Sequence, residues 1–205
     1  MNKQKKPYHH GDLRQAILDE ALRHVRKEGI DSLSLRACSK AVQVSPGAAF
    51  RHFKDKRSLA TAMAAKGFAL MAETIEDRQA QAGPSEMAKF RAVGEGYVLF
   101  ALREPNLFRL MFSKGQIDPN APELREQSKK IPMFTASGKG NLSTGDMLSW
   151  GLVHGLSELA IADHFDGTLP EDIDGKLDAL IKVMAAMGPS FRALSLENSP
   201  DAASG

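Results

Sequence analysis

The sequence predicts an all-α protein of about nine helices, in which a three-helix N-terminal domain precedes a larger helical bundle. Two observations support this fold class. Apolar residues recur at spacings of three and four along most of the chain, and the alternating pattern that is typical of strands is nearly absent. With 205 residues, of which 42% are hydrophobic, the chain can bury one sizeable core or the cores of a small and a larger domain.

The first three helices follow from one apolar stripe and two capping residues. The stripe ends at Gly29, a residue type that commonly terminates helices, and it consists of Leu13, Ile17, Leu18, Ala21, Leu22 and Val25. Ser34 suits the N-cap of a second helix, which we expect to run to about Ala41. Ser45-Pro46 begins a third helix, because proline is favoured at the first helical position.

The later helices are separated by loop-forming residues. A long fourth helix begins near Lys56 and ends before Gly83-Pro84, and a fifth runs from Pro84 to about Arg103, where Glu104-Pro105 interrupts it. The rest is expected to comprise a short apolar helix, NLFRLMF, a loop at 113–122, a weaker helix to Ser137, a linker, GKGNLST, and two strong helices at roughly 144–164 and 171–188.

The charge of the chain is divided unevenly along it. Residues 1–60 hold 13 Lys/Arg against 6 Asp/Glu, whereas the remaining 145 residues hold 14 against 19. A basic head on an acidic body suggests a polyanionic partner at one end only. We divide the chain into a basic arm (1–10), a three-helix domain (11–58), a bundle (59–196) and a disordered tail (197–205).

Several function classes are disfavoured by what the sequence lacks. Cys38 is the only cysteine, so neither an intramolecular disulfide nor a CxxC metal site can form, and a reducing cytoplasmic setting fits. No apolar segment suits a secretory signal or a membrane span. The bundle contains no nucleophile–base pair, phosphate loop or metal-spaced cluster. We therefore expect no catalysis, no metal, no cofactor and no membrane partner.

Residues 33–59 have the layout of a helix-turn-helix, in which the second helix enters the major groove of DNA and the first braces it. Small residues at the start of the second helix allow close backbone approach, and the basic residues that follow suit phosphates. The alternative is a plain three-helix cap on a bundle, with His52 as a half-buried packing histidine. The candidate DNA-binding residues are Ser34, Arg36, Ser45, Pro46, Gly47, Ala48, Ala49, Phe50, Arg51, His52, Lys54 and Lys56.

Several short motifs occur together between residues 8 and 68. They are YHHGDLR at 8–14, LSLR at 33–36, VS at 44–45, RHF at 51–53, DK at 55–56, Leu59 and GF at 67–68. With these motifs, residues 8–68 closely resemble the DNA-binding domain of TetR-type transcriptional regulators. It implies an Ω-shaped homodimer that binds a palindromic operator in double-stranded DNA and releases it when a ligand binds. It also implies phosphate contacts by Arg36, His52 and Lys56, and groove contacts by Ser45 to Ala49.

The chain departs from that family pattern at several positions. Phe50 stands where the family usually has tyrosine, so a hydroxyl directed at phosphate is missing, and DNA affinity would depend more on Arg51 and Lys54. Gln43 replaces the usual turn glycine, which implies strain of about 1 kcal/mol if φ there is positive. Cys38 is expected to be a buried, inert thiol rather than a redox sensor.

The basic arm is a second candidate DNA contact. It could follow the phosphate backbone or reach a minor groove, or it could be a solvated tail that binds nothing. Its basic residues are Lys3, Lys5, Lys6, His9 and His10.

The bundle contains the pattern Trp150-x3-His154-Gly155, which places the indole and the imidazole on one helix face. With EPNLFRLMF, this W-x3-H-G pattern resembles the effector domain of a TetR subgroup named for those three residues. His154 could orient a ligand's polar group or be a core histidine that is hydrogen-bonded across helices. Candidate residues for an apolar small-molecule effector are Phe100, Phe108, Met111, Phe112, Met133, Trp150 and His154.

The last helix carries an apolar stripe that suits a two-fold helical interface. The stripe, which could alternatively only seal the monomer core, consists of Ile173, Leu177, Leu180, Ile181 and Met184. We expect a dimeric regulator, most simply a repressor that an apolar small molecule releases from its operator. The alternative is an architectural DNA-binding dimer without an effector.

Overall fold

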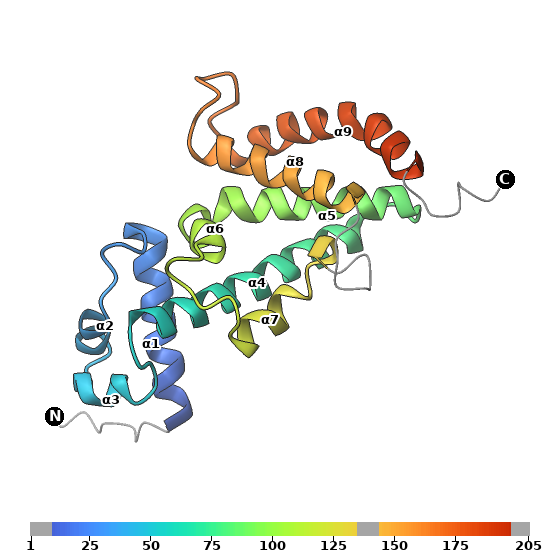
Figure 1. Cartoon of the computed structure of the whole chain (residues 1–205). Coiled ribbons are helices and arrows are strands. Elements are labelled where there is room, and N and C mark those ends of the chain that lie inside the picture. Colours follow the sequence, from blue (N-terminus) through green and yellow to red (C-terminus); the bar gives the residue numbers. More distant parts are fainter. Residues whose placement is uncertain (1–9, 135–143, 198–205) are drawn as a thin grey trace. The chain divides into compact units, whose positions relative to one another are not determined.

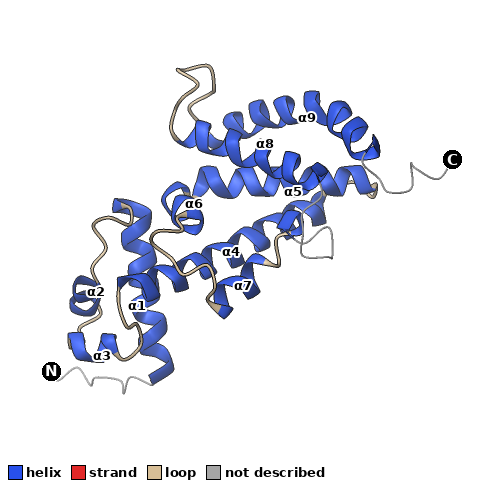
Figure 2. Ribbon diagram, viewed as in Figure 1, coloured by secondary structure: helices blue, strands red, loops and turns tan. Residues whose placement is uncertain are grey.

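The structure is a computed structural model that describes residues 10–134 and 144–197 (Figure 1). Within these ranges it contains nine α-helices, one short 3-10 helix and no strand, which confirms the all-α prediction (Figure 2). The elements are α1 (His10–Glu28), α2 (Leu35–Ala41), α3 (Pro46–Phe50), α4 (Lys56–Gln81), α5 (Glu86–Arg103), α6 (Pro105–Phe112), α7 (Pro122–Ser128), η1 (Pro132–Phe134), α8 (Thr144–Ile161) and α9 (Ile173–Glu197).

The chain forms two compact units whose boundaries differ from the expected domain boundary after residue 58. Unit 1 contains the described residues up to 67 together with 106–125, and unit 2 contains 68–105 and the described residues from 126 onward. Helix α4 therefore begins in unit 1 and ends in unit 2. Of the expected arm and tail, only His10 and Glu197 lie within the described residues.

The core of unit 1 is built on the apolar stripe of α1, which packs against α2 and α3. Ile17, Ala21 and Val25 are fully buried, as are Ala49 on α3 and Leu59 at the start of α4. The two predicted caps are confirmed, because the side chains of the serines before α2 and α3 accept hydrogen bonds from backbone amides within those helices. Local capping and one buried stripe thus determine the three N-terminal helices.

Residues 106–125 belong to unit 1 because the start of α4 bonds and packs against them. Arg57 donates through Nε and Nη2 to the backbone oxygen of Ile117, at 3.2 and 3.0 Å. The backbone N–H of Asp118 donates to Oγ1 of Thr61 at 2.9 Å. Gly67 lies against α6 so closely that an added Cβ would be 2.6 Å from Sδ of Met111.

In unit 2, helices α8 and α9 lie side by side and both contact α5 (Figure 1). The second half of α5 is almost entirely buried from Gly96 to Ala101. Gly96 allows α5 to approach α4, since a Cβ at this position would lie only 2.7 Å from the Cα of Ile75. The backbones of α4 and α5 are therefore in close contact in the core of unit 2.

Two expected helix ends were wrong. The helix expected to reach Ser137 ends at Ser128, and the next described residues form the separate turn η1 at Pro132, where proline cannot continue an α-helix hydrogen-bond pattern. Residues 135–137 and most of the expected linker lie outside the described residues. In contrast, α9 continues past the expected end at 188 to Glu197. Pro189 lies within this helix, and a proline removes one backbone hydrogen bond from a helix without necessarily ending it.

Gln43 has a φ of 58°, in the left-handed region that glycine adopts without strain. Gln43→Gly should therefore stabilise unit 1 by about 0.5–1 kcal/mol, because relief of strain of about 1–2 kcal/mol exceeds the entropy cost of glycine. Gly29, with φ of 76° and no atom within 4 Å of a built Cβ, is the matched control. Gly29→Ala should destabilise through the backbone alone. Thermal unfolding followed by circular dichroism measures both changes in stability. A loss of stability in Gln43→Gly would show that the backbone at Gln43 is not strained.

Candidate functional sites

The exposed face of α3 is the first candidate site. Pro46, Gly47 and Phe50 are exposed on this helix, and a Cβ built on Gly47 meets no atom within 4 Å. Ala48 is half-buried, whereas Ala49 is fully buried and points into the core of unit 1. The expected groove contact by the Ala49 methyl is therefore corrected: Ala49 is a packing residue, and the surface that can be presented to a ligand is formed by its exposed neighbours.

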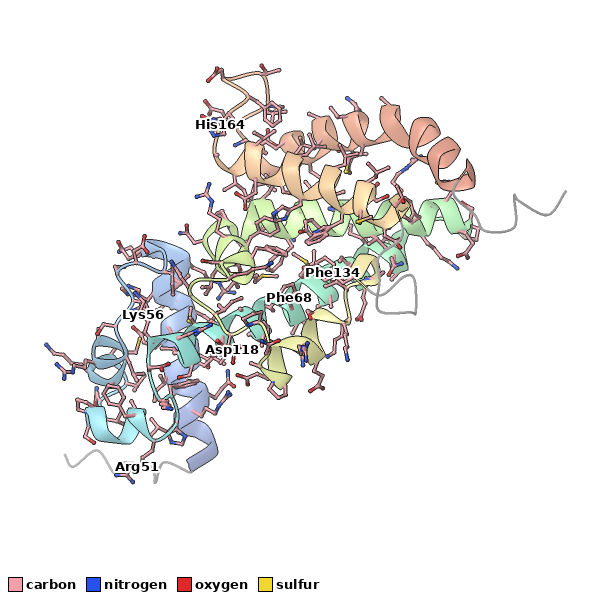
Figure 3. All side chains as sticks on the ribbon, viewed as in Figure 1. Arg51, Lys56, Phe68, Asp118, Phe134 and His164 are labelled. Carbon is pink, nitrogen blue, oxygen red and sulfur yellow. The ribbon has the colours of Figure 1, made fainter. Side chains whose placement is uncertain are left out.

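Exposed positively charged side chains lie on α2 and directly after α3. Arg51 follows α3 and is exposed (Figure 3). Lys54 and, on α2, Arg36 are also exposed. His52 is half-buried. Lys56 is exposed, but its Nζ donates to the backbone oxygen of Asp31 at 2.9 Å and so helps to hold α4 to the turn before α2.

The charge imbalance is larger for the two structural units than for the two halves of the sequence. Unit 1 contains 17 Lys/Arg and 8 Asp/Glu, a balance of +9, and unit 2 contains 10 and 17, a balance of −7, when all residues of the chain are counted. The exposed α3 face thus belongs to a strongly basic unit, and such a unit attracts polyanions.

Arg14 connects the start of α1 to two other parts of unit 1. Its guanidinium lies 5.1 Å from the ring centroid of Phe53, and its Nη2 donates to Oε2 of Glu123 on α7 at 3.0 Å. Phe53 is buried just beyond α3. The thiol of Cys38 is also buried, and this burial raises its pKa, as expected for a packing residue rather than a reactive thiol.

The second candidate site is a series of aromatic rings in unit 2. Phe68 of α4 contacts Phe134 of η1 edge-to-face at 6.0 Å between centroids (Figure 3), and Phe134 contacts Trp150 of α8 in the same way at 5.0 Å. His154 lies 6.0 Å from Trp150 and 6.4 Å from Tyr97 of α5. Phe134, Trp150 and His154 are half-buried, so part of this aromatic series reaches the surface of the unit.

A hydrogen-bonded group joins the polar ends of three of these rings. Trp150 donates through Nε1 to the hydroxyl oxygen of the fully buried Tyr97 at 3.3 Å, and that oxygen lies 2.9 Å from Nδ1 of His154. Burial lowers the pKa of His154, so the neutral imidazole can accept the Tyr97 O–H through Nδ1. Burial likewise raises the pKa of the Tyr97 hydroxyl, which keeps its proton. Both Trp150 and His154 are thereby held in fixed orientations.

The other expected effector residues are divided between the two units. Phe108 and Met111 are buried in unit 1, where Phe108 contacts Phe112 at 5.1 Å between centroids. Phe100 is buried in unit 2, and the side chain of Met133 lies outside the described residues. Of the expected set, Trp150 and His154 have ring contacts with the other members of the aromatic series.

The apolar stripe expected on the last helix largely faces inward. Leu177 and Leu180 are buried within the single chain, and Met184 lies near Gly94 of α5, so these residues seal the core of unit 2. The expectation that Leu177 and Leu180 are available to a partner subunit is thus corrected. Ile181 is half-buried, and Ile173 is exposed. The large apolar side chains exposed on α8 and α9 are Met147, Leu159, Ile173 and Val183.

Comparison with known proteins identifies both halves of the chain. Residues 17–63 match the family described as bacterial regulatory proteins, tetR family, and residues 90–184 match the Tetracyclin repressor-like, C-terminal domain. The chain belongs to the TetR family. This family is one of regulators rather than enzymes, in agreement with the sequence. Within the described ranges, no cluster of His, Cys, Asp or Glu suits a metal ion, and each helix is too short or too polar to cross a bilayer.

The curated relatives of this TetR-family chain match only part of it. It is 39% identical over 64 residues to the HTH-type transcriptional repressor AcnR of Corynebacterium efficiens, which is 31% of this chain and 34% of that protein. It is 48% identical over 48 residues to the HTH-type transcriptional regulator AcrR of Shigella flexneri, which is 23% and 22%. The matches thus span about a third or less of the length of these relatives.

One solved structure is similar over nearly the whole TetR-family chain. It is a protein with unknown function from Rhodococcus sp. RHA1, with 28% identity and a TM-score of 0.70, and the similarity covers 93% of this chain and 100% of that one. The folds of both units therefore occur together in one chain of known structure.

The sequence interpretation missed three side chains of the aromatic series in this TetR-family chain, Phe68, Tyr97 and Phe134. Tyr97 is one of only two tyrosines and lies in the apolar segment YVLF, where a hydroxyl needs a partner. That signal points to a buried hydrogen bond without revealing its partner, because His154 lies 57 residues further along the chain.

Proposed function

We propose that this TetR-family chain is a transcriptional regulator that binds double-stranded DNA through the exposed face of α3. The observation that carries the proposal is this face itself, which presents Pro46, Gly47, Phe50 and Arg51 in a unit of charge +9. Exposed cations next to the face would contact phosphates, which supply affinity, and the helix itself would contact base edges, which supply sequence preference. A protein with this role works in the cytoplasm, where the DNA lies.

We propose further that the chain acts as a homodimer on a palindromic operator. A dimer presents two reading helices, and half-sites of such operators lie one helical turn apart, about 34–36 Å. The exposed apolar side chains of α8 and α9, rather than Leu177 and Leu180, supply the surface for the partner subunit. Repression is the mode of regulation that the similarity to AcnR supports.

The effector of this regulator would bind at the half-buried aromatic series of unit 2. Phe134 and Trp150 offer ring surface to an apolar small molecule, and the hydrogen bonds with Tyr97 hold Trp150 and His154 in place. The W-x3-H-G pattern supports assignment to the corresponding subgroup. Helix α4 links unit 2 covalently to unit 1, so a ligand with different affinities for two α4 positions would shift DNA binding.

The test of the DNA proposal is a duplex titration at several salt concentrations. We expect affinity to fall steeply with salt, with two chains per selected site, and Arg36→Ala to weaken binding to all sequences alike and to lower the salt slope by about one. Arg91→Ala, which removes an exposed arginine of unit 2, is the control and should leave the slope unchanged. Binding that responds little to salt would overturn the proposal.

A further inference from the structure

Phe50 is the only large apolar side chain of unit 1 that is exposed, among the side chains that the structure describes. Its exposed fraction is 44%, so a large part of the residue is accessible to a ligand. A single exposed apolar residue is ordinary on a protein surface. Phe50 differs because it lies at the end of the helix that we propose to enter the major groove.

The neighbours of Phe50 give this ring an open surface. Pro46 and Gly47 precede it by four and three residues, so they share its helix face, and a Cβ built on Gly47 meets no atom within 4 Å. Ala49 points the other way, into the core. Arg51 follows directly and is exposed. Phe50 therefore shares its helix face with a residue that has no side chain, and a cation follows it in the sequence.

The chemistry of the ring limits what it can contact on DNA. A phenyl group neither donates nor accepts a conventional hydrogen bond, so it cannot bind a phosphate oxygen or a polar base edge as a tyrosine hydroxyl would. The apolar feature of the major groove is the C5 methyl group of thymine, and phenylalanine is one of the side chains that contact it.

We propose that Phe50 is a specificity-determining residue that contacts the C5 methyl of one thymine in each half-site. This inference rests on the proposed DNA-binding function and deepens it. Burial of one methyl-sized group corresponds to about a fourfold gain in affinity. Because uracil is thymine without this methyl group, replacing thymine by uracil deletes the proposed contact and nothing else in the base pair.

The experiment uses the full chain and a duplex selected from a random library. Each thymine of a half-site is replaced by uracil in turn, and affinity is measured for the wild type and Phe50→Ala. We expect one replacement to weaken wild-type binding about fourfold per half-site. Phe50→Ala should bind thymine and uracil duplexes equally at that position. Phe90→Ala removes an exposed phenylalanine from α5 in unit 2 and should keep the wild-type response.

The outcomes separate this contact from the proposed function. Wild-type binding that ignores every uracil replacement, a selected half-site without thymine, or an equal response in Phe50→Ala would overturn the methyl contact alone. In the last case a group other than the Phe50 ring contacts the methyl. Absence of any salt-dependent duplex binding would overturn the proposed function together with the contact. Thermal unfolding of Phe50→Ala establishes that the variant is folded.

Discussion

Gly96→Ala is expected to destabilise unit 2 by about 2–3 kcal/mol. The added Cβ would lie 2.7 Å from the Cα of Ile75, closer than atoms can approach, and a tight 3.1 Å from its backbone nitrogen. Because the obstacle is backbone and not the end of a flexible side chain, α4 and α5 must move apart. The buried contacts around Tyr97 and Leu99 in the same half of α5 would loosen with them.

Gly94→Ala is the matched control in the same helix. Its Cβ would lie 3.6 Å from Cγ1 of Val153, an ordinary contact distance, so the change should raise stability by about 0.5–1 kcal/mol through better helix propensity. Trp150 is the only tryptophan and lies in unit 2, so its fluorescence during denaturant unfolding reports on this unit. Equal effects of the two substitutions would show that helix propensity, not the close approach, dominates.

Helix boundaries were predictable where the determining contacts are local. The limits of α2 follow from Ser34, whose side chain caps the helix within one turn, and the end of α1 follows from Gly29 with its positive φ. The expected α5 began at Pro84, two residues early, because the cap is formed by Ser85. Such errors are small since caps act over three or four residues.

The partner of a buried surface was not predictable from periodicity. The segment NLFRLMF was expected to form a short apolar helix, yet nothing in its pattern indicates that it packs against Gly67 of α4. The stripe of α9 likewise indicates burial of Leu177 and Leu180 but cannot distinguish a core within the chain from a subunit interface. Both distinctions depend on contacts between residues far apart in sequence.

The candidate DNA site shows the same division. Composition and spacing identified α3 and its basic neighbours, but a helix of five residues is too short for periodicity to separate Ala48 from Ala49. In the structure Ala48 is half-buried and Ala49 is fully buried, whereas Gly47 and Phe50 are exposed. We therefore propose that Phe50 and Gly47 contact the bases. The substitution of tyrosine by phenylalanine at Phe50 is visible in sequence, whereas its exposure is not.

Tyr97→Phe is expected to lower the unfolding free energy of unit 2 by about 1–3 kcal/mol. Tyr97 is fully buried and its hydroxyl connects Trp150 Nε1 to His154 Nδ1, so its removal takes one partner from each of two half-buried groups. Thr74→Val is the control, because the Thr74 hydroxyl donates only to Leu70 in its own helix and its loss should cost less. Denaturant unfolding measures both, and equal costs would argue against a joining role for Tyr97.

The pH dependence of stability tests the protonation state that this network requires. Burial lowers the pKa of His154 in the folded chain below the unfolded value of about 6.5, so the unfolded state binds more protons in this range. The contribution is fully present above about pH 6.5 and is lost as the pH falls through the lower folded pKa. Neither Glu158, which opposes the shift, nor Tyr97, which stays protonated, reverses this direction. Wild-type stability should therefore fall on acidification more steeply than that of His154→Gln, whereas equal slopes would mean that His154 is not held neutral.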